Sequence, residues 1–211
     1  MTPDLGVDVA IDASDMPAFA NGQRYVSANG AKRERFSDPD ASWGHRSAVS
    51  TRKGGGFYGY KLDLAVCART SLPIAWQTRT ARHHESLFVA PLLDSMRARG
   101  FQPTTVALDR GYDYNRIYDE TRERGCVPVV AIKKTRLAIP LTPIPYGSPE
   151  WKRLYRGRAA AEREFGRLKH DYGLAPLRVR GLARVQLHAN LTIMARLALA
   201  LNRAQAVPLA A

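Results

Sequence analysis

Cysteine is scarce in this sequence, and long apolar runs are missing. Cys67 and Cys126 are the two cysteines among 211 residues, which is too few for a disulfide framework or a cysteine-based metal site. Both lie in apolar, strand-like stretches, so we expect buried free thiols in a reducing compartment. No apolar run approaches the roughly 18 residues that cross a bilayer, and the first residues do not have the pattern of a signal peptide. We therefore expect a cytoplasmic protein without a membrane partner.

Acidic residues are also in short supply. Lysine and arginine together number 32 against 19 aspartates and glutamates, which gives a formal net charge of +13. The excess is concentrated between Arg122 and Arg184, where basic residues outnumber acidic ones three to one. Such a charge balance in a folded domain is typical of proteins that bind nucleic acid. A membrane surface is the competing polyanion, but the sequence has no strongly basic amphipathic helix with a bulky apolar face.

Two common cofactor-binding motifs are missing as well. The glycine-rich run before the second predicted strand lacks the G-x4-G-K-[ST] pattern of a P-loop, so no nucleotide cofactor is expected. His83, His84 and Glu85 lack the H-x3-H spacing of a zinc site, and we interpret them as capping and surface residues at the start of a helix. Arg52 and Lys53 are equally consistent with a DNA contact and with a solvated loop.

The order of predicted elements indicates an α/β fold. The stretches with a strand pattern are 6–14, 57–68, 73–81, 104–109 and 126–134. The stretches with helical periodicity are 85–100, 114–125, 154–169 and 182–205. The last helix carries apolar residues at core spacing, namely Leu187, Leu191, Met194, Leu197 and Leu201. Helices that alternate with buried strands after an antiparallel start predict a mixed sheet flanked by helices on both faces. We expect one domain, residues 1–211, with a polar basic loop or hairpin arm at about 21–56.

Three carboxylates stand where a divalent-metal site can form. Asp12 ends the first strand, Asp109 ends the strand 104–109, and Glu162 lies on the basic helix. Carboxylates at strand ends, joined by a third from a nearby helix, supply the oxygen ligands that Mg²⁺ prefers. Asp8 and Asp15 are alternatives to Asp12, although Asp8 is at the opposite end of its strand and Asp15 follows it.

The helix 154–169 has an unusual polar stripe. Tyr155, Arg158, Glu162 and Lys169 lie within about 60° of one another around a helix, whereas Glu164 faces the other way and is expected to be solvated. Taken alone, the stripe is also consistent with a surface helix in which Arg158 pairs with Glu162 four residues later.

These residues together resemble a known family. The motif "ALDRGYD", which contains Asp109, is followed by Y-x2-R-x3-E-x6-K, and this combination resembles the catalytic core of DDE-type bacterial transposases of the cut-and-paste insertion-sequence class. The segments "DPDASW" and "FYGYKLDLA" are also similar to this family, so the resemblance covers about residues 5–205. It implies an RNase H-like fold and a metal-binding catalytic triad for Mg²⁺ or Mn²⁺, made of Asp12, Asp109 and Glu162. It also implies contacts to transposon-end phosphates from three side chains, Tyr155, Arg158 and Lys169.

The implied activity is metal-dependent DNA cleavage and strand transfer at insertion-sequence ends, by a protein that dimerises on double-stranded DNA. Two other functions stay open from the residues, a hydrolytic RNase H-like nuclease and a non-catalytic DNA-binding remnant of a transposase. Relatives carry an N-terminal DNA-binding region before the first catalytic strand, and we expect it to be missing here. Within "DRGYD", we expect Gly111 to supply a tight turn and Asp113 to be the N-cap of the next helix.

Overall fold

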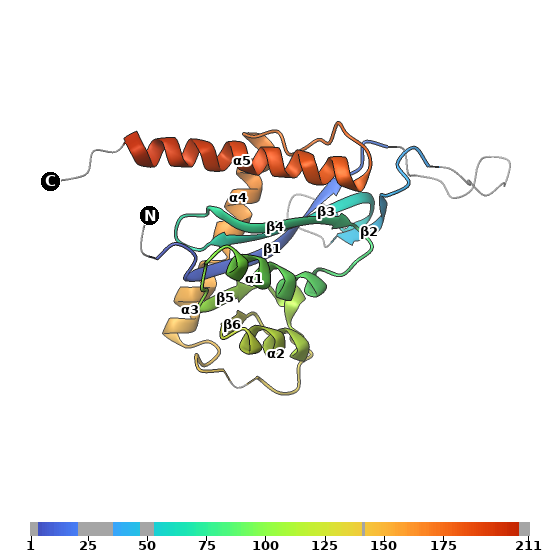
Figure 1. Ribbon diagram of the computed structural model, residues 1–211. Coiled ribbons are helices and arrows are strands. Elements are labelled where there is room, and N and C mark those ends of the chain that lie inside the picture. Colours follow the sequence, from blue (N-terminus) through green and yellow to red (C-terminus); the bar gives the residue numbers. More distant parts are fainter. Residues whose placement is uncertain (1–3, 21–35, 47–52, 141, 207–211) are drawn as a thin grey trace. The chain divides into compact units, whose positions relative to one another are not determined.

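The elements of the structure follow the predicted order, with one strand added and one helix divided. The computed structural model describes residues 4–20, 36–46, 53–140 and 142–206 (Figure 1). The strands are β1 (Asp8–Pro17), β2 (Ser42–Arg46), β3 (Gly55–Cys67), β4 (Pro73–Thr80), β5 (Thr105–Leu108) and β6 (Val127–Val130). The α-helices are α1 (Val89–Ala98), α2 (Asn115–Glu123), α3 (Pro149–Arg156), α4 (Ala159–His170) and α5 (Leu182–Ala206). Two short 3₁₀ helices are η1 (Glu85–Phe88) and η2 (Arg110–Tyr112). The added strand β2 lies within the stretch predicted as a loop or arm, of which residues 21–35 and 47–52 are outside the described residues.

The six strands of the described residues form one mixed sheet. Their order is β2-β3-β1-β5-β6, and β4 also pairs with β3. β2 runs antiparallel to β3, whereas β1 with β5 and β5 with β6 are parallel pairs. A parallel pair needs a crossover, and α2 supplies it between β5 and β6. This open sheet with helices confirms the predicted α/β class and is compatible with an RNase H-like fold.

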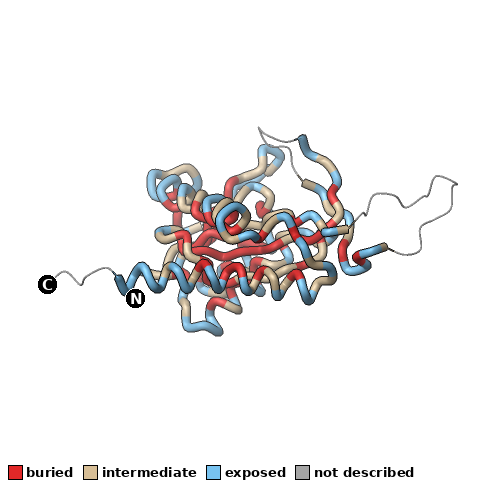
Figure 2. Tube along the Cα trace, turned by 90° about the horizontal axis from the view of Figure 1, so that it is seen from above, coloured by how far each residue is buried: buried red, intermediate tan, exposed pale blue. Residues whose placement is uncertain are grey.

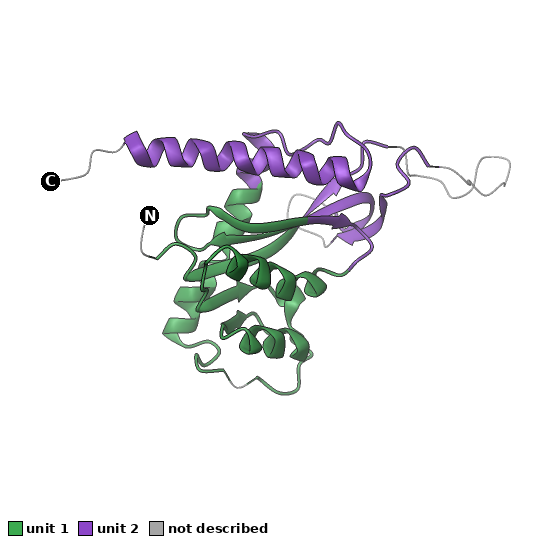
Figure 3. Cartoon of the chain, in the orientation of Figure 1, with its two compact units in different colours: residues 1–13, 63–77, 84–165 green, residues 14–62, 78–83, 166–211 purple. Residues whose placement is uncertain are grey.

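The chain divides into two compact units (Figure 3). Unit 1 consists of residues 1–13, 63–77 and 84–165. Unit 2 consists of residues 14–62, 78–83 and 166–211. Both strand-end carboxylates predicted from the sequence, Asp12 and Asp109, belong to unit 1, as does Glu162.

Alternating side chains on the strands of unit 1 build a core on each face of the sheet. The strand residues of the first core include Val9, Ile11, Val106 and Leu108. They pack against α1 residues at helical spacing, namely Val89, Leu92, Leu93 and Met96. On the other face, Val127 and Val129 of β6 pack against Trp151 and Leu154 of α3. Within unit 1, helices therefore cover both faces of the sheet, as predicted.

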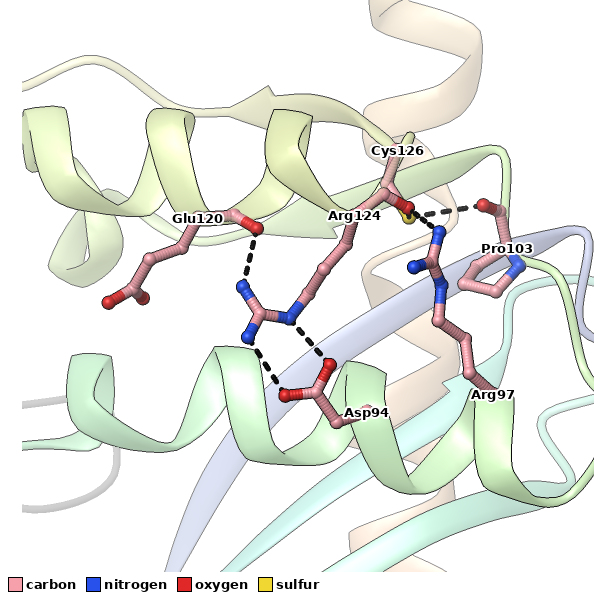
Figure 4. A network of polar contacts seen from close by, with 6 residues as sticks. All are labelled: Asp94, Arg97, Pro103, Glu120, Arg124 and Cys126. Carbon is pink, nitrogen blue, oxygen red and sulfur yellow. Dashed lines mark hydrogen bonds and ion pairs between the residues drawn. The ribbon is translucent and has the colours of Figure 1, made fainter.

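The guanidinium group of Arg124 joins helices α1 and α2 (Figure 4). Its Nε and Nη2 donate to the two carboxylate oxygens of Asp94, each at 2.8 Å. Its Nη1 donates to the carbonyl oxygen of Glu120 at 2.9 Å, and Arg97 donates to the carbonyl oxygen of Arg124 itself. Two-point contacts between Arg and a carboxylate are stronger and more directional than single neutral hydrogen bonds. This pairing fixes the last turns of α1 and α2 to each other.

Two aspartates of the "DPDASW" segment organise unit 2. Asp38 is fully buried, and its Oδ1 accepts from the Tyr60 hydroxyl at 2.6 Å and from the Gly181 N–H at 3.1 Å. Asp40 Oδ2 accepts from the N–H of Leu182, the first residue of α5, at 2.8 Å. The first N–H groups of a helix have no intrahelical partner, so Asp40 caps α5 from a distant part of the chain. Its negative charge also suits the helix N-terminus.

The apolar stripe predicted as the core face of α5 is exposed instead. Four of its residues are 56–60% exposed, namely Leu187, Leu191, Met194 and Leu201. The buried positions of α5 are Val185, Ala189, Thr192, Ile193 and Arg196, and Figure 2 shows them alternating with exposed ones along the helix. Both sets recur with the helical period, so periodicity alone did not distinguish the buried face from the exposed one.

The structure also bears on the expectations about the two cysteines and about membrane-spanning helices. Cys67 and Cys126 are buried free thiols, as predicted. Among the described residues, no helix combines the length and the apolar character that crossing a bilayer requires.

Asp40→Ala is expected to lower the free energy of unfolding by about 1 kcal/mol, because it leaves the Leu182 N–H at the start of α5 without its carboxylate acceptor. Urea unfolding followed by circular dichroism measures the loss. Asp171→Ala, which removes an exposed acidic residue of the same unit, is the matched control. A loss no larger than that of the control contradicts the capping role.

Candidate active site

The parallel pairing of β1 with β5 brings Asp12 and Asp109 to the same level of the sheet. Asp8 pairs with Thr105, and the register runs on through the next two residue pairs. Continuing it by two more residues sets Asp12 opposite Asp109. Neighbouring strands are about 4.8 Å apart, and residues separated by an even number share a face. Both carboxylates therefore lie on the face that α3 covers. Asp109 directly follows β5 as predicted, but Asp12 is in the middle of β1, which continues to Pro17, so the prediction that Asp12 ends its strand is wrong.

The Asp12 carboxyl group has an unusual protonation equilibrium. Burial raises its pKa, and the negative charge of Asp109 raises it further, to about 7. Its side chain is 20% exposed, and its Oδ1 accepts from the N–H of Ala13 at 2.8 Å, which opposes the shift. Repulsion between two such carboxylates falls when a cation binds between them. The negative charge of the pair therefore favours a cation.

The turn that follows Asp109 holds its side chain in place. Asp109 Oδ1 accepts from the Gly111 N–H at 2.6 Å, so the residue is the N-cap of η2, the tight turn predicted at this position. Burial raises the pKa of Asp109, the Gly111 N–H lowers it, and the charge of Glu85 raises it again. A Cβ on Gly111 would lie 2.8 Å from Asp109 Oδ1 and 2.8 Å from Glu85 Oε1. Glycine at this position leaves room for two carboxylates.

The helix predicted over 154–169 is divided at Gly157 and Arg158. These two residues form a turn closed by backbone hydrogen bonds to carbonyl groups three residues earlier. A Cβ on Gly157 would lie 2.9 Å from the Cβ of Ala68, so glycine allows the turn to approach the end of β3 closely. The prediction of one continuous helical stripe is therefore wrong. Tyr155 lies on α3, Arg158 lies in the turn, and Glu162 and Lys169 lie on α4.

Arg158 lies between two of the candidate carboxylates. Its Nη1 is 3.7 Å from Asp12 Oδ2, and its Nη2 donates to Glu162 Oε1 at 2.6 Å. The pair with Glu162 is the i,i+4 contact expected from the spacing, and it survives the break in the helix. Asp12 and Glu162 thus meet at one guanidinium group.

Tyr155 and Lys169, the other two residues of the predicted polar stripe, lie in different surroundings. Tyr155 stacks on Trp151, with ring centroids 4.6 Å apart and planes inclined by 12°. Burial raises the pKa of Tyr155 and the charge of Arg158 lowers it, with a net upward shift that keeps the phenol protonated as a hydrogen-bond donor. Lys169 lies near the end of α4, in the part of this helix that belongs to unit 2.

The donor set of unit 1 suits a hard divalent cation. Asp12 and Asp109 supply carboxylate oxygens, and Mg²⁺ usually takes one or two carboxylates per ion, with waters and substrate oxygens completing its shell. In the part of the chain that the structure describes, no three His, Cys, Asp or Glu side chains form a ready-made metal-binding group. Glu162 pairs with Arg158. The positive charge of Arg158 also lies beside Asp12, at a position that favours a cation. The fit of these residues to a divalent cation therefore rests on Asp12 and Asp109. The guanidinium of Arg158 lies between Asp12 and Glu162.

The two alternatives to Asp12 have partners elsewhere. Asp8 lies at the start of β1, where its Oδ1 accepts from the Thr105 hydroxyl at 2.5 Å. Asp15 belongs to unit 2 and lies 3.7 Å from Arg46 Nε and 3.9 Å from Lys61 Nζ. Lys53, the described member of the Arg52–Lys53 pair, is exposed.

Two predictions about single acidic residues are wrong. Asp113 does not cap α2, which has no side-chain cap. It is buried instead and accepts from the Lys133 N–H at 2.8 Å, from Arg136 Nη1 at 2.7 Å and from the Tyr118 hydroxyl at 3.1 Å. Glu164, expected to be solvated, is fully buried. Glu162 and Glu164 both lie on α4 and face different ways as expected, but the face of Glu164 is the buried one. Helical angles alone did not tell which face other elements cover.

Sequence reasoning missed Glu85 as a member of this region. His84 caps η1 as predicted, since its Nδ1 accepts from the Ser86 N–H at 3.2 Å. Glu85, however, is half-buried with its carboxylate against Gly111. After burial, its negative charge is among the causes that raise the pKa of both Asp12 and Asp109. No spacing in the sequence connects residue 85 with residue 109, so no local signal was available.

Comparison with known protein families places these residues in context. The family described as "Transposase DDE domain" matches residues 4–198, which include all the residues of the candidate site. Members of this family generally use divalent metal ions. No curated protein matches the chain.

Asp12→Asn is expected to raise the stability of the metal-free protein at pH 8 and to change it little at pH 4. In the folded chain the Asp12 pKa is about 7, against about 3.9 for an unfolded aspartate. The unfolded chain therefore ionises first as the pH rises, and the stability of the parent falls between about pH 4 and 7. The uncharged variant lacks this fall, so the difference at pH 8 is on the order of 2–4 kcal/mol.

Thermal unfolding at the two pH values, with a chelator present, measures this difference. Asp171→Asn serves as the control, because that residue is exposed and belongs to unit 2. Equal stability of Asp12→Asn and parent at pH 8 counts against an electrostatic penalty at Asp12.

Proposed function

Because the chain belongs to the transposase DDE domain family, we propose that it is a DDE transposase that cleaves DNA at insertion-sequence ends and transfers the freed strand to target DNA. One observation carries the proposal. The register of β1 with β5, extended by two residues, sets Asp12 level with Asp109, and Asp12 meets Glu162 at the guanidinium of Arg158. Residues far apart in the sequence thus supply the acidic groups that phosphoryl-transfer chemistry requires.

In this proposal Asp12, Asp109 and Glu162 hold Mg²⁺ or Mn²⁺. When bound, the metal activates the attacking oxygen and stabilises the leaving oxygen of an in-line displacement at phosphorus. Asp12, with its pKa of about 7, gives up its proton on binding, so protons and cations compete for the same oxygens. Metal affinity then falls as the pH drops below neutral.

The reaction has two steps at phosphorus. In the first, a water oxygen attacks the phosphodiester at the end of the element, the P–O3′ bond breaks, and a 3′-hydroxyl is released. In the second, this 3′-hydroxyl attacks a phosphodiester of the target, and a P–O3′ bond of the target breaks as the new one forms. The protein groups around the carboxylates have to hold the DNA backbone in line for both steps.

Arg158, Tyr155 and Lys169 are the residues we assign to this positioning. A guanidinium matches two phosphate oxygens at once, and Arg158 becomes available for this contact when a cation replaces it beside Asp12. The protonated phenol of Tyr155 donates one further hydrogen bond. Lys169 follows Glu162 by two helical turns on α4 and adds a positive charge. Contacts to phosphates fix the register of the duplex without reading its sequence.

We assign double-stranded DNA as the partner, at both the transposon ends and the target. The net charge of +13 supports a polyanionic ligand of this kind. Two ends of one element are joined to one target, which requires two active sites, so the proposal includes a dimer on DNA.

Glu162→Gln is expected to reduce strand cleavage on the order of 100-fold or more and to leave DNA affinity within about twofold, because it removes a metal ligand and no phosphate contact. The substrate is a labelled duplex that carries the terminal inverted repeat flanking the coding sequence, with Mg²⁺ or Mn²⁺ present. Fluorescence anisotropy of the same duplex gives the affinity.

The matched control for this experiment is Glu150→Gln, which neutralises an exposed acid on α3. Equal cleavage by Glu162→Gln and parent removes Glu162 from the active site. A parent that cleaves without joining strands favours the hydrolytic nuclease, and one that binds without cleaving favours the non-catalytic remnant.

Arg158→Ala is expected to weaken DNA binding and cleavage together. Loss of one phosphate contact lowers the slope of log affinity against log salt concentration by about one. Binding titrations at several salt concentrations measure the slope. Arg122→Ala, which removes an exposed arginine paired with Asp119, is the control. An unchanged slope in Arg158→Ala excludes the phosphate contact.

A further inference from the structure

We propose that Glu85 is a further carboxylate of the cation site assigned to Asp12, Asp109 and Glu162, and that it contributes directly to the affinity for Mg²⁺ or Mn²⁺. This inference rests on the proposed function and deepens it. Glu85 comes from η1, outside the two motifs that carry the resemblance to transposases. Its carboxylate approaches the same glycine, Gly111, as that of Asp109.

The geometry around Gly111 carries the proposal. A Cβ at this position would lie 2.8 Å from Asp109 Oδ1 and equally 2.8 Å from Glu85 Oε1. Two carboxylate oxygens from separate elements thus crowd the same glycine, although like charges repel. Glu85 has three side-chain torsions, so its carboxylate can turn toward a cation held by Asp12 and Asp109. Among the described residues the present arrangement is no ready-made metal group, so the proposal requires the Glu85 carboxylate to turn toward the cation when it binds.

The hydroxyl of Tyr112 is a second, independent observation. Tyr112 is 1% exposed, and its hydroxyl has no hydrogen-bond partner among the described residues. Beyond burial, the charges of Asp12 and Glu85 are the largest causes that raise the pKa of Tyr112. A buried hydroxyl beside several carboxylates without a partner is costly. A water or an ion between these groups would give it one.

The position of Glu85 is fixed by contacts at both ends of the α1–α2 pair. Arg116 Nη2 donates to the carbonyl oxygen of Ser86 at 3.0 Å, which ties η1 to the first turn of α2. At the other end, Arg124 holds Asp94 of α1 (Figure 4). The first contact holds the backbone next to Glu85 against α2, the helix that follows η2.

The charge balance of the region also favours a further cation. Glu85 Oε1 and Asp109 Oδ1 approach the same glycine, and Arg158 Nη1 lies 3.7 Å from Asp12 Oδ2. That guanidinium also pairs with Glu162. One arginine therefore faces several carboxylates, and a divalent ion compensates the remainder.

Titration of Mn²⁺ into the full chain, followed by the electron paramagnetic resonance signal of free Mn²⁺, tests the inference. We expect Glu85→Gln to weaken Mn²⁺ binding about tenfold or more. Glu150→Gln is the matched control and should bind as the parent does, whereas Asp12→Asn should lose the site. Unchanged affinity in Glu85→Gln overturns the inference, and so does a parent that binds no Mn²⁺ at millimolar concentration.

A second readout separates ligation from a structural role. Without metal, Glu85→Gln is expected to raise the melting temperature, because it removes one of several repelling charges. With saturating Mn²⁺, the variant should gain less stability than the parent. A lower melting temperature with an unchanged Mn²⁺ effect marks a structural residue and overturns the inference. Failure here leaves the proposed function standing, since that is decided by cleavage in the parent and in Glu162→Gln.

Discussion

The parallel register between β1 and β5 is the constraint on which the candidate site depends. With Asp8 level with Thr105, the apolar residues Val9 and Ile11 enter the core beneath α1, and Asp12 falls opposite Asp109 on the other face. A slip of one residue would turn every β1 side chain to the opposite face, which would move Val9 and Ile11 out of the core beneath α1 and the acidic residues into it. Burial of the core therefore enforces the alignment of the carboxylates, and folding and site formation follow from one pairing.

This alignment makes the metal-free protein less stable than the fold alone would allow. Asp12 sits partly buried beside a second carboxylate, and burial and that charge together raise its pKa to about 7. Groups held in such surroundings are typical of functional sites. Neighbouring parts of unit 1 offset the cost: Arg158 pairs with Glu162 beside Asp12, and Arg124 locks α1 to α2. A rigid frame thus supports a group of charges that repel one another.

Local patterns predicted the elements well, and distant contacts account for what they missed. Alternation in 6–14 placed Val9 and Ile11 on one face of β1 and Asp12 on the other, which the structure confirms. The break at Gly157 depends on its approach to Ala68, about 90 residues earlier in the chain, which helical periodicity does not contain. The sequence around Asp113 is typical of an N-cap, but its carboxylate accepts hydrogen bonds from Lys133 and Arg136, which follow β6. The role of Glu85 was missed for the same reason, because its approach to Gly111 is a contact between residues distant in the sequence.

Arg158 links the metal and the DNA in the proposed reaction. Its guanidinium now offsets the charges of Asp12 and Glu162. A cation that takes over these carboxylates releases the guanidinium, and a phosphate that binds the guanidinium uncovers the carboxylates. Each ligand therefore favours the other, and linkage requires the two effects on affinity to be equal. On this assignment Arg158 neutralises the carboxylates until both the cation and the DNA are bound. The acidic groups therefore become fully available to the metal when the scissile phosphate binds the guanidinium.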